Sequence, residues 1–286
     1  MIVFTYKMFS DILGILKLPR IASLSTIILG ILFFPWTLYS VFIYGNIAGL
    51  FFATSAFKYT MLFIDSLKEF NSFKISYIVI SAVSMMLSVM VKNNYLILIA
   101  LIIYTVAEAL RHRNIQIILV TCAVIAGFAI QAIVPKLVIE KISGCNLGSG
   151  ASSWTWIAMG LHPSDGNVYA DGWYSGRIAA FYENNDYDTK KEAEVSKAEI
   201  KGYIDTYKND HKAFTSFLSK KVASQWNNPE FQCFWITNVR SSDIEKSPVI
   251  SDILSLKGSS TFIAFLNIMQ SIILLGSMLY AVNTLI

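Results

Sequence analysis

Charged side chains are scarce in this 286-residue chain, in which Asp, Glu, Lys and Arg together make up only 15% while hydrophobic residues make up 55%. A soluble globular domain normally keeps its apolar share below half. The mean hydropathy of +0.53 points in the same direction. The composition therefore excludes an ordinary soluble domain and favours a protein dissolved in a lipid bilayer.

The usual sequence signatures of several enzyme classes are also missing. There is no GxSxG nucleophile motif, no Walker phosphate-binding motif and no GxGxxG dinucleotide fingerprint. Lysines such as Lys190, Lys191, Lys220 and Lys221 are expected on helices beside Glu and Asp, which indicates a solvated surface. We therefore expect no nucleic-acid partner. The first residues also show no cleavable signal peptide.

The three cysteines are too few for a disulfide framework. Cys122 lies inside an apolar run, where a buried thiol is expected. Cys145 and Cys233 both fall in a long polar stretch that we place outside the cytoplasm, where oxidation is possible. A disulfide between them and two unpaired thiols are both open.

Long apolar runs are what the sequence has in abundance. A helix needs about 20 residues to cross about 30 Å of hydrocarbon, and six runs reach or approach that length. They are residues 24–44, 47–64, 75–91, 95–109, 115–134 and 262–285. The runs predict an all-α polytopic membrane protein with about six transmembrane helices plus an external, mainly helical domain.

The pattern divides the chain into four parts. Residues 1–20 are expected to form an interfacial amphipathic segment, because Lys7, Ser10 and Asp11 interrupt their apolar character. A five-helix transmembrane region (21–135), an external domain (136–258) and a C-terminal transmembrane helix (259–286) follow.

Basic residues predict the orientation in the membrane, because cytoplasmic loops carry an excess of Lys and Arg. One side of the predicted bundle collects Lys7, Lys17, Arg20, Lys68, Lys74, Arg111 and Arg113. If that side is cytoplasmic, residues 136–258 form a long extracytoplasmic loop of a multi-pass protein in the cell membrane.

The external stretch begins with a Gly/Ser-rich loop (143–153) and a short interfacial or re-entrant helix (154–161). Two soluble helices at 189–207 and 211–226 are predicted to pack as a hairpin. The first opens with a capping box of Thr189 and Glu192. The second places apolar side chains on one face at spacings of three and four, namely Phe214, Phe217, Leu218 and Val222.

The turn Lys92-Asn93-Asn94-Tyr95 places one charge and two amides between two apolar runs, on the side expected to be external. In a simple turn, Lys92 would extend to the lipid headgroups. Alternatively, an ammonium beside amide donors at the membrane surface suits a lipid phosphate. Both interpretations are open.

The loop at 162–176 is rich in Gly, Asp, Asn and Tyr. Carboxylates beside Trp and Tyr are typical of sugar sites, which need polar oxygens for hydroxyls and an aromatic face for the ring. The candidate acceptor or sugar-binding residues are His162, Asp165, Asp171, Trp173, Tyr174 and Arg177. The alternative is an ordinary glycine-rich loop whose aspartates cap turns.

No resident metal or other cofactor is expected. A divalent cation held by His162, Asp165 and Asp171 is the lesser alternative, because these three residues show no coordination spacing.

Four short segments, taken in order, resemble a known family. They are Phe34-Pro35-Trp36 with Phe42-Ile43-Tyr44-Gly45, Val91 to Tyr95, Trp156 to Leu161, and Gly172-Trp173-Tyr174. This order resembles the later part of a GT-C superfamily membrane glycosyltransferase, of the bacterial kind related to protein O-mannosyltransferases and the lipid A aminoarabinose transferase.

The resemblance implies transfer of a sugar from a polyprenyl-phosphate carrier to a glycan, lipid or protein acceptor in the cell envelope. It also implies that Lys92, Asn93, Asn94 and Tyr95 face the donor phosphate, and that the loop at 160–174 lies over the acceptor. Such enzymes use an acidic base in the first external loop. The turn Gly45-Asn46 holds no acid, so the chain resembles a fragment after that loop and its catalytic residues are unknown.

A non-enzymatic membrane transport or assembly component is the alternative function. Transport pathways tend to place ionisable residues within the spans. The predicted spans hold few of them, and Lys58 and Glu108 are expected near span ends. This distribution favours a reaction site at the membrane surface.

Overall fold

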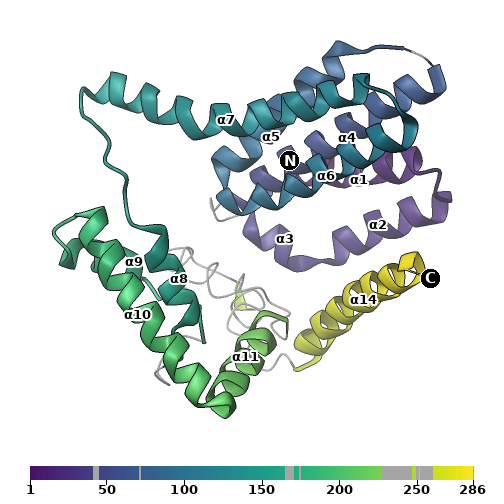
Figure 1. The fold of residues 1–286 in the computed structure, drawn as a ribbon. Coiled ribbons are helices and arrows are strands. Elements are labelled where there is room, and N and C mark those ends of the chain that lie inside the picture. The colour runs from purple at the N-terminus through teal and green to yellow at the C-terminus, as the bar shows by residue number, and fades with distance from the viewer. Residues whose placement is uncertain are drawn as a thin grey trace. The chain divides into compact units, whose positions relative to one another are not determined.

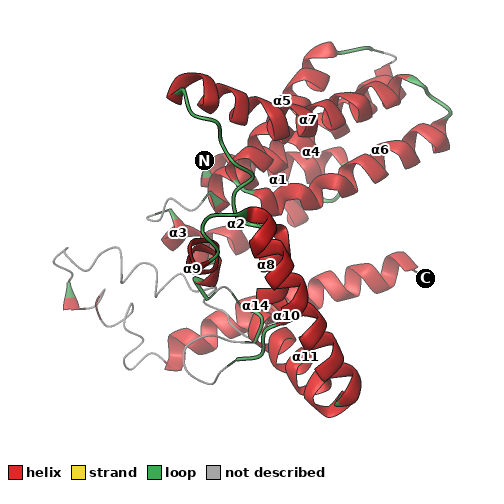
Figure 2. Ribbon diagram, turned by 60° about the vertical axis from the view of Figure 1, so that its left-hand side comes forward, coloured by secondary structure: helices red, strands yellow, loops and turns green. Residues whose placement is uncertain are grey.

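The computed structural model describes residues 1–40, 45–70, 72–164, 171–173, 175–226, 247–248, 251 and 260–285. Of these residues, 84% are helical and none lies in a strand, as Figures 1 and 2 show. The predicted all-α class is therefore confirmed. The chain divides into two compact units, Met1–Val138 with Glu230–Ile286 and Ile139–Pro229, which are described separately as unit 1 and unit 2.

Within the described residues, four helical stretches are long and apolar enough to cross a membrane. They are α4 (Asn46–Phe70), η1 with α6 (Asn93–His112), α7 (Gln116–Ser143), and the part Ile263–Tyr280 of α14 (Ser260–Leu285). Two more apolar helices, α2 (Arg20–Leu32) and α5 (Ile75–Val91), are shorter. Four of the six predicted spans thus reach the required length, and the remaining two stay predictions.

The first predicted span, 24–44, is interrupted. Helix α2 ends at Leu32, and the short helix α3 (Phe34–Tyr39) begins after Phe33, whose φ of −80° and ψ of 78° are not helical. Pro35 lacks an N–H and its ring clashes with the carbonyl four residues earlier. The first predicted span is therefore divided into two helices at this position.

Helix α1 (Ile2–Ile15), predicted to lie in the membrane interface, packs against α2 and α4 of unit 1. Its buried face consists of Thr5, Met8 and Ile12, which recur at helical spacing. The Tyr6 hydroxyl donates to the Gly30 carbonyl of α2 at 2.7 Å. The position of α1 in the membrane interface stays a prediction. In the structure α1 packs against two helices of unit 1, α2 and α4.

Small hydroxyl side chains line the contact between α4 and α5. The Ser55 and Ser84 hydroxyls lie 3.0 Å apart, and those of Thr60 and Ser81 lie 2.6 Å apart. The Ser88 hydroxyl donates to the Gly49 carbonyl at 2.9 Å. Close packing through small residues with polar cross-links is typical of helix pairs in lipid, where burial of apolar surface drives little association.

An apolar core joins α4 and α5 to α6 (Ile99–His112) and α7. Its fully or nearly fully buried side chains are Phe63, Ile64, Leu67, Ile78, Ala109, Ile117 and Val120. Cys122 lies on another face of α7 and is exposed, so the predicted buried thiol is wrong: the face of α7 that packs inward carries Val120 and Val124 instead.

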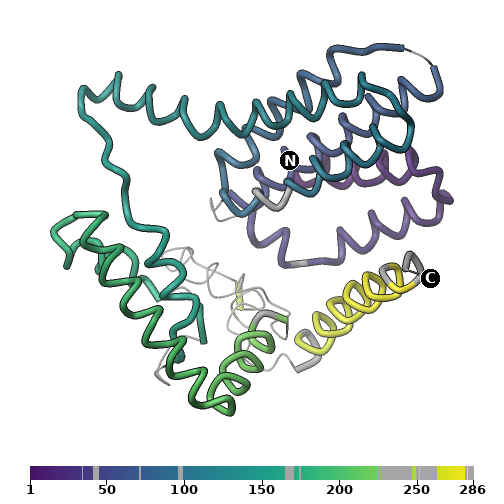
Figure 3. The backbone as a smooth tube through the Cα atoms, in the orientation of Figure 1, coloured from purple at the N-terminus to yellow at the C-terminus, as the bar shows by residue number. Residues whose placement is uncertain are grey.

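Unit 2 consists of α8 (Ser153–Leu161), α9 (Arg177–Asn184), α10 (Thr189–Asn209) and α11 (His211–Trp226). Asp210 joins the last two helices and caps α11 by accepting from the Lys212 and Ala213 N–H groups at 3.0 and 2.9 Å. The Tyr207 and Phe217 rings stack with centroids 5.2 Å apart. The predicted helical hairpin is therefore confirmed (Figure 3).

Two details of this hairpin differ from the prediction. The N-cap of α10 is Asp188, whose carboxylate accepts from the Lys191 and Lys190 N–H groups. These backbone donors hold the pKa of Asp188 below its usual value. The predicted Thr189–Glu192 capping box is wrong, because Glu192 is fully buried and faces α8 instead.

The second difference is the inward face of α11. Of the apolar residues predicted to share one packed face, Phe217 is buried, whereas Phe214, Leu218 and Val222 are exposed. The predicted helical period of α11 is confirmed, but the prediction that all four apolar residues pack on one buried face is wrong.

Candidate functional site

The turn at Lys92 connects α5 to the short helix η1 (Asn93–Leu98). Lys92 follows the last residue of α5 in extended conformation and is half-buried. Its Nζ donates to the Asn46 Oδ1, and the Tyr95 hydroxyl donates to the Asn46 carbonyl at 2.7 Å. Asn46, the first residue of α4, thus holds both ends of the turn.

Two glycines allow this close approach. Gly45 has a φ of +74°, and a Cβ there would lie 2.9 Å from the Val91 carbonyl. A Cβ at Gly49 would overlap the Tyr95 ring. A larger residue at position 45 would push α4 away from the end of α5, and one at position 49 would displace the Tyr95 ring, so the two glycines help to fix the turn that carries Lys92.

Asn93 and Asn94 are exposed on the same turn. The structure thus provides one ammonium, held by an amide oxygen, beside two solvent-accessible amides at one end of α4 and α5. An ammonium and amide N–H groups can all donate to an anion.

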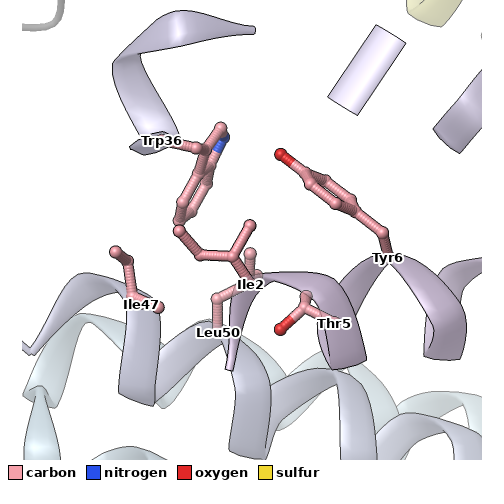
Figure 4. Close-up of a pocket in the computed structure, with 6 residues that line it drawn as sticks. All are labelled: Ile2, Thr5, Tyr6, Trp36, Ile47 and Leu50. Atoms are coloured by element: carbon pink, nitrogen blue, oxygen red, sulfur yellow. The ribbon is translucent and has the colours of Figure 1, made fainter. Parts of the chain in front are cut away.

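An apolar hollow begins one residue after Asn46. It is lined by α1, α3 and α4 through Ile2, Thr5, Tyr6, Trp36, Ile47 and Leu50. Figure 4 shows the side chains of Trp36 and Tyr6 on either side of this hollow. Because the Tyr6 hydroxyl is engaged by the Gly30 carbonyl, the hollow presents mainly hydrocarbon.

The loop residues predicted to bind sugar have varied surroundings in unit 2. Asp171 is buried and accepts from the Ser164 N–H at 2.6 Å. Trp173 donates from Nε1 to the Ser224 Oγ of α11 at 2.7 Å. Asp165 and Tyr174 lie outside the described residues.

The remaining two candidates face α10. Arg177 forms an ion pair with Glu199, and the His162 ring meets the Tyr203 ring edge-on at 5.8 Å. The described candidates therefore contact two different helices and hold the loop in place. The Asp171 contact joins Ser164 to a residue seven positions later and is not a local turn cap, so the sugar-binding and structural interpretations both stay predictions.

Sequence reasoning missed Lys221, which reaches the same loop from α11. Its Nζ donates to the Gly160 carbonyl at 2.5 Å, near the C-terminal end of α8. Gly172 has a φ of +67°, and a Cβ there would lie 2.5 Å from that carbonyl and 2.8 Å from the Lys221 Nζ. The glycine is required because two segments converge on its α-carbon.

Glu192 was recognised only as a capping residue, although it is fully buried. Its carboxylate accepts from the Ser152 N–H at 2.6 Å and from the Thr155 hydroxyl at 2.8 Å. The Thr155 hydroxyl also lies 2.9 Å from that of Ser196. Glu192 therefore satisfies the donors at the start of α8, where a carboxylate is favourable.

Unit 1 contains an ion pair that corrects a further prediction. Lys58 lies in the middle of α4 and not near its end, and its side chain is 17% exposed. Its Nζ lies 2.7 Å from the Asp11 carboxylate of α1. Glu108 lies near the end of α6, as predicted, and pairs with Lys68.

Among the described residues, no group of three His, Cys, Asp or Glu side chains could hold a metal ion. The alternative cation site stays untested, because Asp165 is not described. The disulfide between Cys145 and Cys233 also stays a prediction. Cys145 is exposed, and Cys233 lies outside the described residues.

No family model, curated protein or solved structure matches this chain.

Proposed function

We propose that the chain is a membrane glycosyltransferase of the GT-C type, or the C-terminal part of one. It would move a sugar from a polyprenyl-phosphate carrier to a cell-envelope glycan, lipid or protein acceptor. One observation carries the proposal: the Lys92 ammonium, held by Asn46, lies beside exposed amides at one end of the apolar helices α4 and α5.

The surroundings of Lys92 suit both parts of such a carrier. A phosphate is attracted by an ammonium and accepts hydrogen bonds from amide N–H groups. The isoprenoid chain is hydrocarbon and needs an apolar surface, which the exposed apolar side chains of α5, such as Val91 and Met90, would supply next to Lys92. The hollow lined by Ile47, Trp36 and Leu50 is too small to enclose such a chain.

In the proposed reaction an acceptor hydroxyl attacks the anomeric carbon of the sugar. A carboxylate base takes the hydroxyl proton, the new glycosidic bond forms, and the bond to the carrier breaks so that polyprenyl phosphate leaves. Negative charge develops on the phosphate, where Lys92 would stabilise it. We assign the base to no residue of this chain.

The experiment is sugar transfer in membranes, with a polyprenyl-phosphate sugar as donor. Lys92→Ala should lower the rate at least about tenfold, because loss of a donor aimed at developing charge costs about 3 kcal/mol in well-ordered sites. Lys74→Ala is the matched control, since Lys74 is exposed just before α5 begins, and it should leave the rate unchanged.

A second measurement separates binding from chemistry. Polyprenyl phosphate alone should bind the purified chain more weakly in Lys92→Ala than in the wild type or Lys74→Ala. If Lys92→Ala keeps the wild-type rate of transfer and the wild-type affinity for the carrier, Lys92 has no role in the mechanism. The simple-turn interpretation, in which Lys92 extends toward the lipid headgroups, would then hold. Absence of any transfer by the chain and by membranes that contain it would refute the enzymatic proposal.

The second candidate is a transport or assembly component, and the Lys58–Asp11 pair favours it. Ionisable residues in the middle of membrane helices are costly and often belong to ion or substrate pathways. Here Lys58 lies midway along a candidate span and has a carboxylate partner on α1. A structural role for the pair is equally compatible with the geometry, and a double variant described in the Discussion separates the two.

A further inference from the structure

Helix α11 exposes a continuous apolar stripe. Phe214, Leu218, Val222 and Trp226 recur every four residues and are 41%, 45%, 46% and 54% exposed. Four-residue steps move only about 40° around a helix, so the side chains form one broad face. Tyr207 of α10 stacks on the buried Phe217 and also contacts Phe214, so the stripe begins beside the hairpin contact and continues along α11.

The charge on α11 has one sign. The helix carries Lys212, Lys220 and Lys221 and contains no Asp or Glu. This corrects the expectation that these lysines sit beside acids, which holds for α10 with its glutamates but not for α11. Lys221 turns toward the Gly160 carbonyl, whereas Lys212 and Lys220 are exposed.

We infer that the exposed face of α11 docks on the surface of a lipid bilayer that contains anionic headgroups. A helix with Trp, Phe and Leu on one face, and with lysines and other polar residues over most of the remainder, is the type that lies in the membrane interface. The lysines add attraction to anionic lipid within a Debye length of the surface.

The chain itself keeps α11 within reach of a bilayer. Helix α7 is long and apolar enough to span a membrane, and nine residues separate its end at Ser143 from the start of α8 at Ser153. Such a linker extends to about 30 Å at most. Unit 2 is therefore tethered close to the membrane that α7 enters.

A second copy of the chain is an alternative occupant that the test below distinguishes. Lys212 and Lys220 lie four residues before and after Ser216, on the side of α11 away from the stripe, so they would not repel each other across a contact between two stripes. A lipid surface supplies both the hydrocarbon and the opposite charge.

The test uses the full chain in nanodiscs with phosphatidylglycerol, after Cys122, Cys145 and Cys233 are replaced by serine. An environment-sensitive fluorophore is attached at Leu218→Cys or, as the matched control, at Ser216→Cys, an exposed position on the far side of α11. Brominated lipid should quench the probe at residue 218 at least about threefold more than the probe at 216. Aqueous iodide should show the reverse order.

Each other outcome overturns the inference. Equal access of iodide to both probes would mean that α11 faces water. Shielding of residue 218 from iodide without quenching by brominated lipid would assign the face to a protein, and to a second copy if the shielding disappears on dilution.

The role of charge is tested separately with the Leu218→Cys probe. Because Lys212 and Lys220 lie on the side of α11 away from the stripe, the pair Lys212→Gln and Lys220→Gln should lower the docked-to-undocked ratio by at most about fivefold per lysine at low salt. The control pair Lys201→Gln and Lys208→Gln removes the same charge from exposed positions of α10 and should have little effect. If the α11 double variant and the α10 control double variant have the same docked-to-undocked ratio, anionic lipid is rejected as the partner.

Discussion

At the scale of single residues, the buried carboxylate of Glu192 shows how much a local pattern leaves undetermined. Its position three residues after Thr189 suggested a cap for its own helix. In the folded chain it reaches the start of α8 and is fully enclosed. Satisfying a buried backbone N–H is more valuable than adding a cap to a solvated helix end, because an unpaired buried donor has no water to replace the lost acceptor.

We expect Glu192→Ala to lower the unfolding free energy of unit 2 by about 1–3 kcal/mol, because the Ser152 N–H and Thr155 hydroxyl lose their acceptor inside the protein. Glu194→Ala is the matched control on the exposed side of α10 and should change stability by less than about 0.5 kcal/mol. Thermal unfolding of the purified chain measures both. Equal midpoints for the two variants would show that Glu192 is not a structural anchor.

The same limit applies to Lys92, the candidate phosphate-binding residue. Its neighbours in sequence, Asn93 and Asn94, suggested an anion site, but the residue that holds its ammonium is Asn46, far away along the chain. The turn between the first two predicted spans was noted only for its lack of an acid. A residue's partners follow from helix packing, which no spacing within the turn can indicate.

At the scale of helices, the contact between α1 and α4 includes the ion pair of Asp11 and Lys58 in an apolar setting. Removing one member of a poorly solvated pair leaves an uncompensated charge, which costs about 3–5 kcal/mol when the site is fully buried. Asp11 retains about a third of its exposure, so we expect a smaller effect than that range.

We expect Lys58→Met and Asp11→Asn each to reduce the thermal stability of the purified chain, and the double variant to recover most of the loss. The recovery follows because an apolar or neutral pair avoids the desolvation of two charges. Lys7→Met is the control, since Lys7 is largely exposed and pairs with the same carboxylate at 3.2 Å.

The same double variant distinguishes the two candidate functions. If the pair is structural, the recovered protein should also recover sugar transfer. A double variant that is stable, transfers sugar poorly and abolishes ion or solute flux in vesicles would instead support the transport alternative.

For helix α11, the sequence predicted the bounds correctly but not the face that packs inside unit 2. Its helical period and its place in the hairpin followed from the sequence, because both rest on local spacing. Its inward face was decided by Tyr207, which stacks on Phe217 and leaves Leu218 outside. Apolar residues that a soluble helix would bury are left for another surface to cover.

At the scale of the whole molecule, the arrangement of basic residues predicts which side of the membrane each loop occupies. Lys68 lies in the last turn of α4, Lys74 directly precedes α5 and Arg111 lies in the last turn of α6, so these side chains gather at one end of the helices in unit 1. Lys92 lies at the other end, where α5 finishes and α4 begins. The positive-inside bias predicts that Lys92 and residues 136–258 lie outside the cytoplasm.

We therefore expect an alkaline phosphatase fused after Asp210 to be exported and active, and one fused after Arg113 to be inactive. A green fluorescent protein at the same positions should give the opposite pattern, which controls for expression. An inactive phosphatase at Asp210 with a fluorescent counterpart would invert the orientation and, with it, the proposed chemistry of an extracytoplasmic carrier.

By itself, the sequence determined the all-α architecture and the extents of α10 and α11, and its apolar runs predicted helices long enough to cross a membrane. These depend on composition and on helical period, which are properties of neighbouring residues. Only the tertiary structure decided that Asn46 holds Lys92, that Lys58 meets Asp11, that Glu192 closes the start of α8 and that α11 turns its apolar stripe outward. Each of these depends on which helices come together, because a polar or apolar side chain is satisfied by whatever surface the fold brings to it, and that choice is made between segments far apart in the chain.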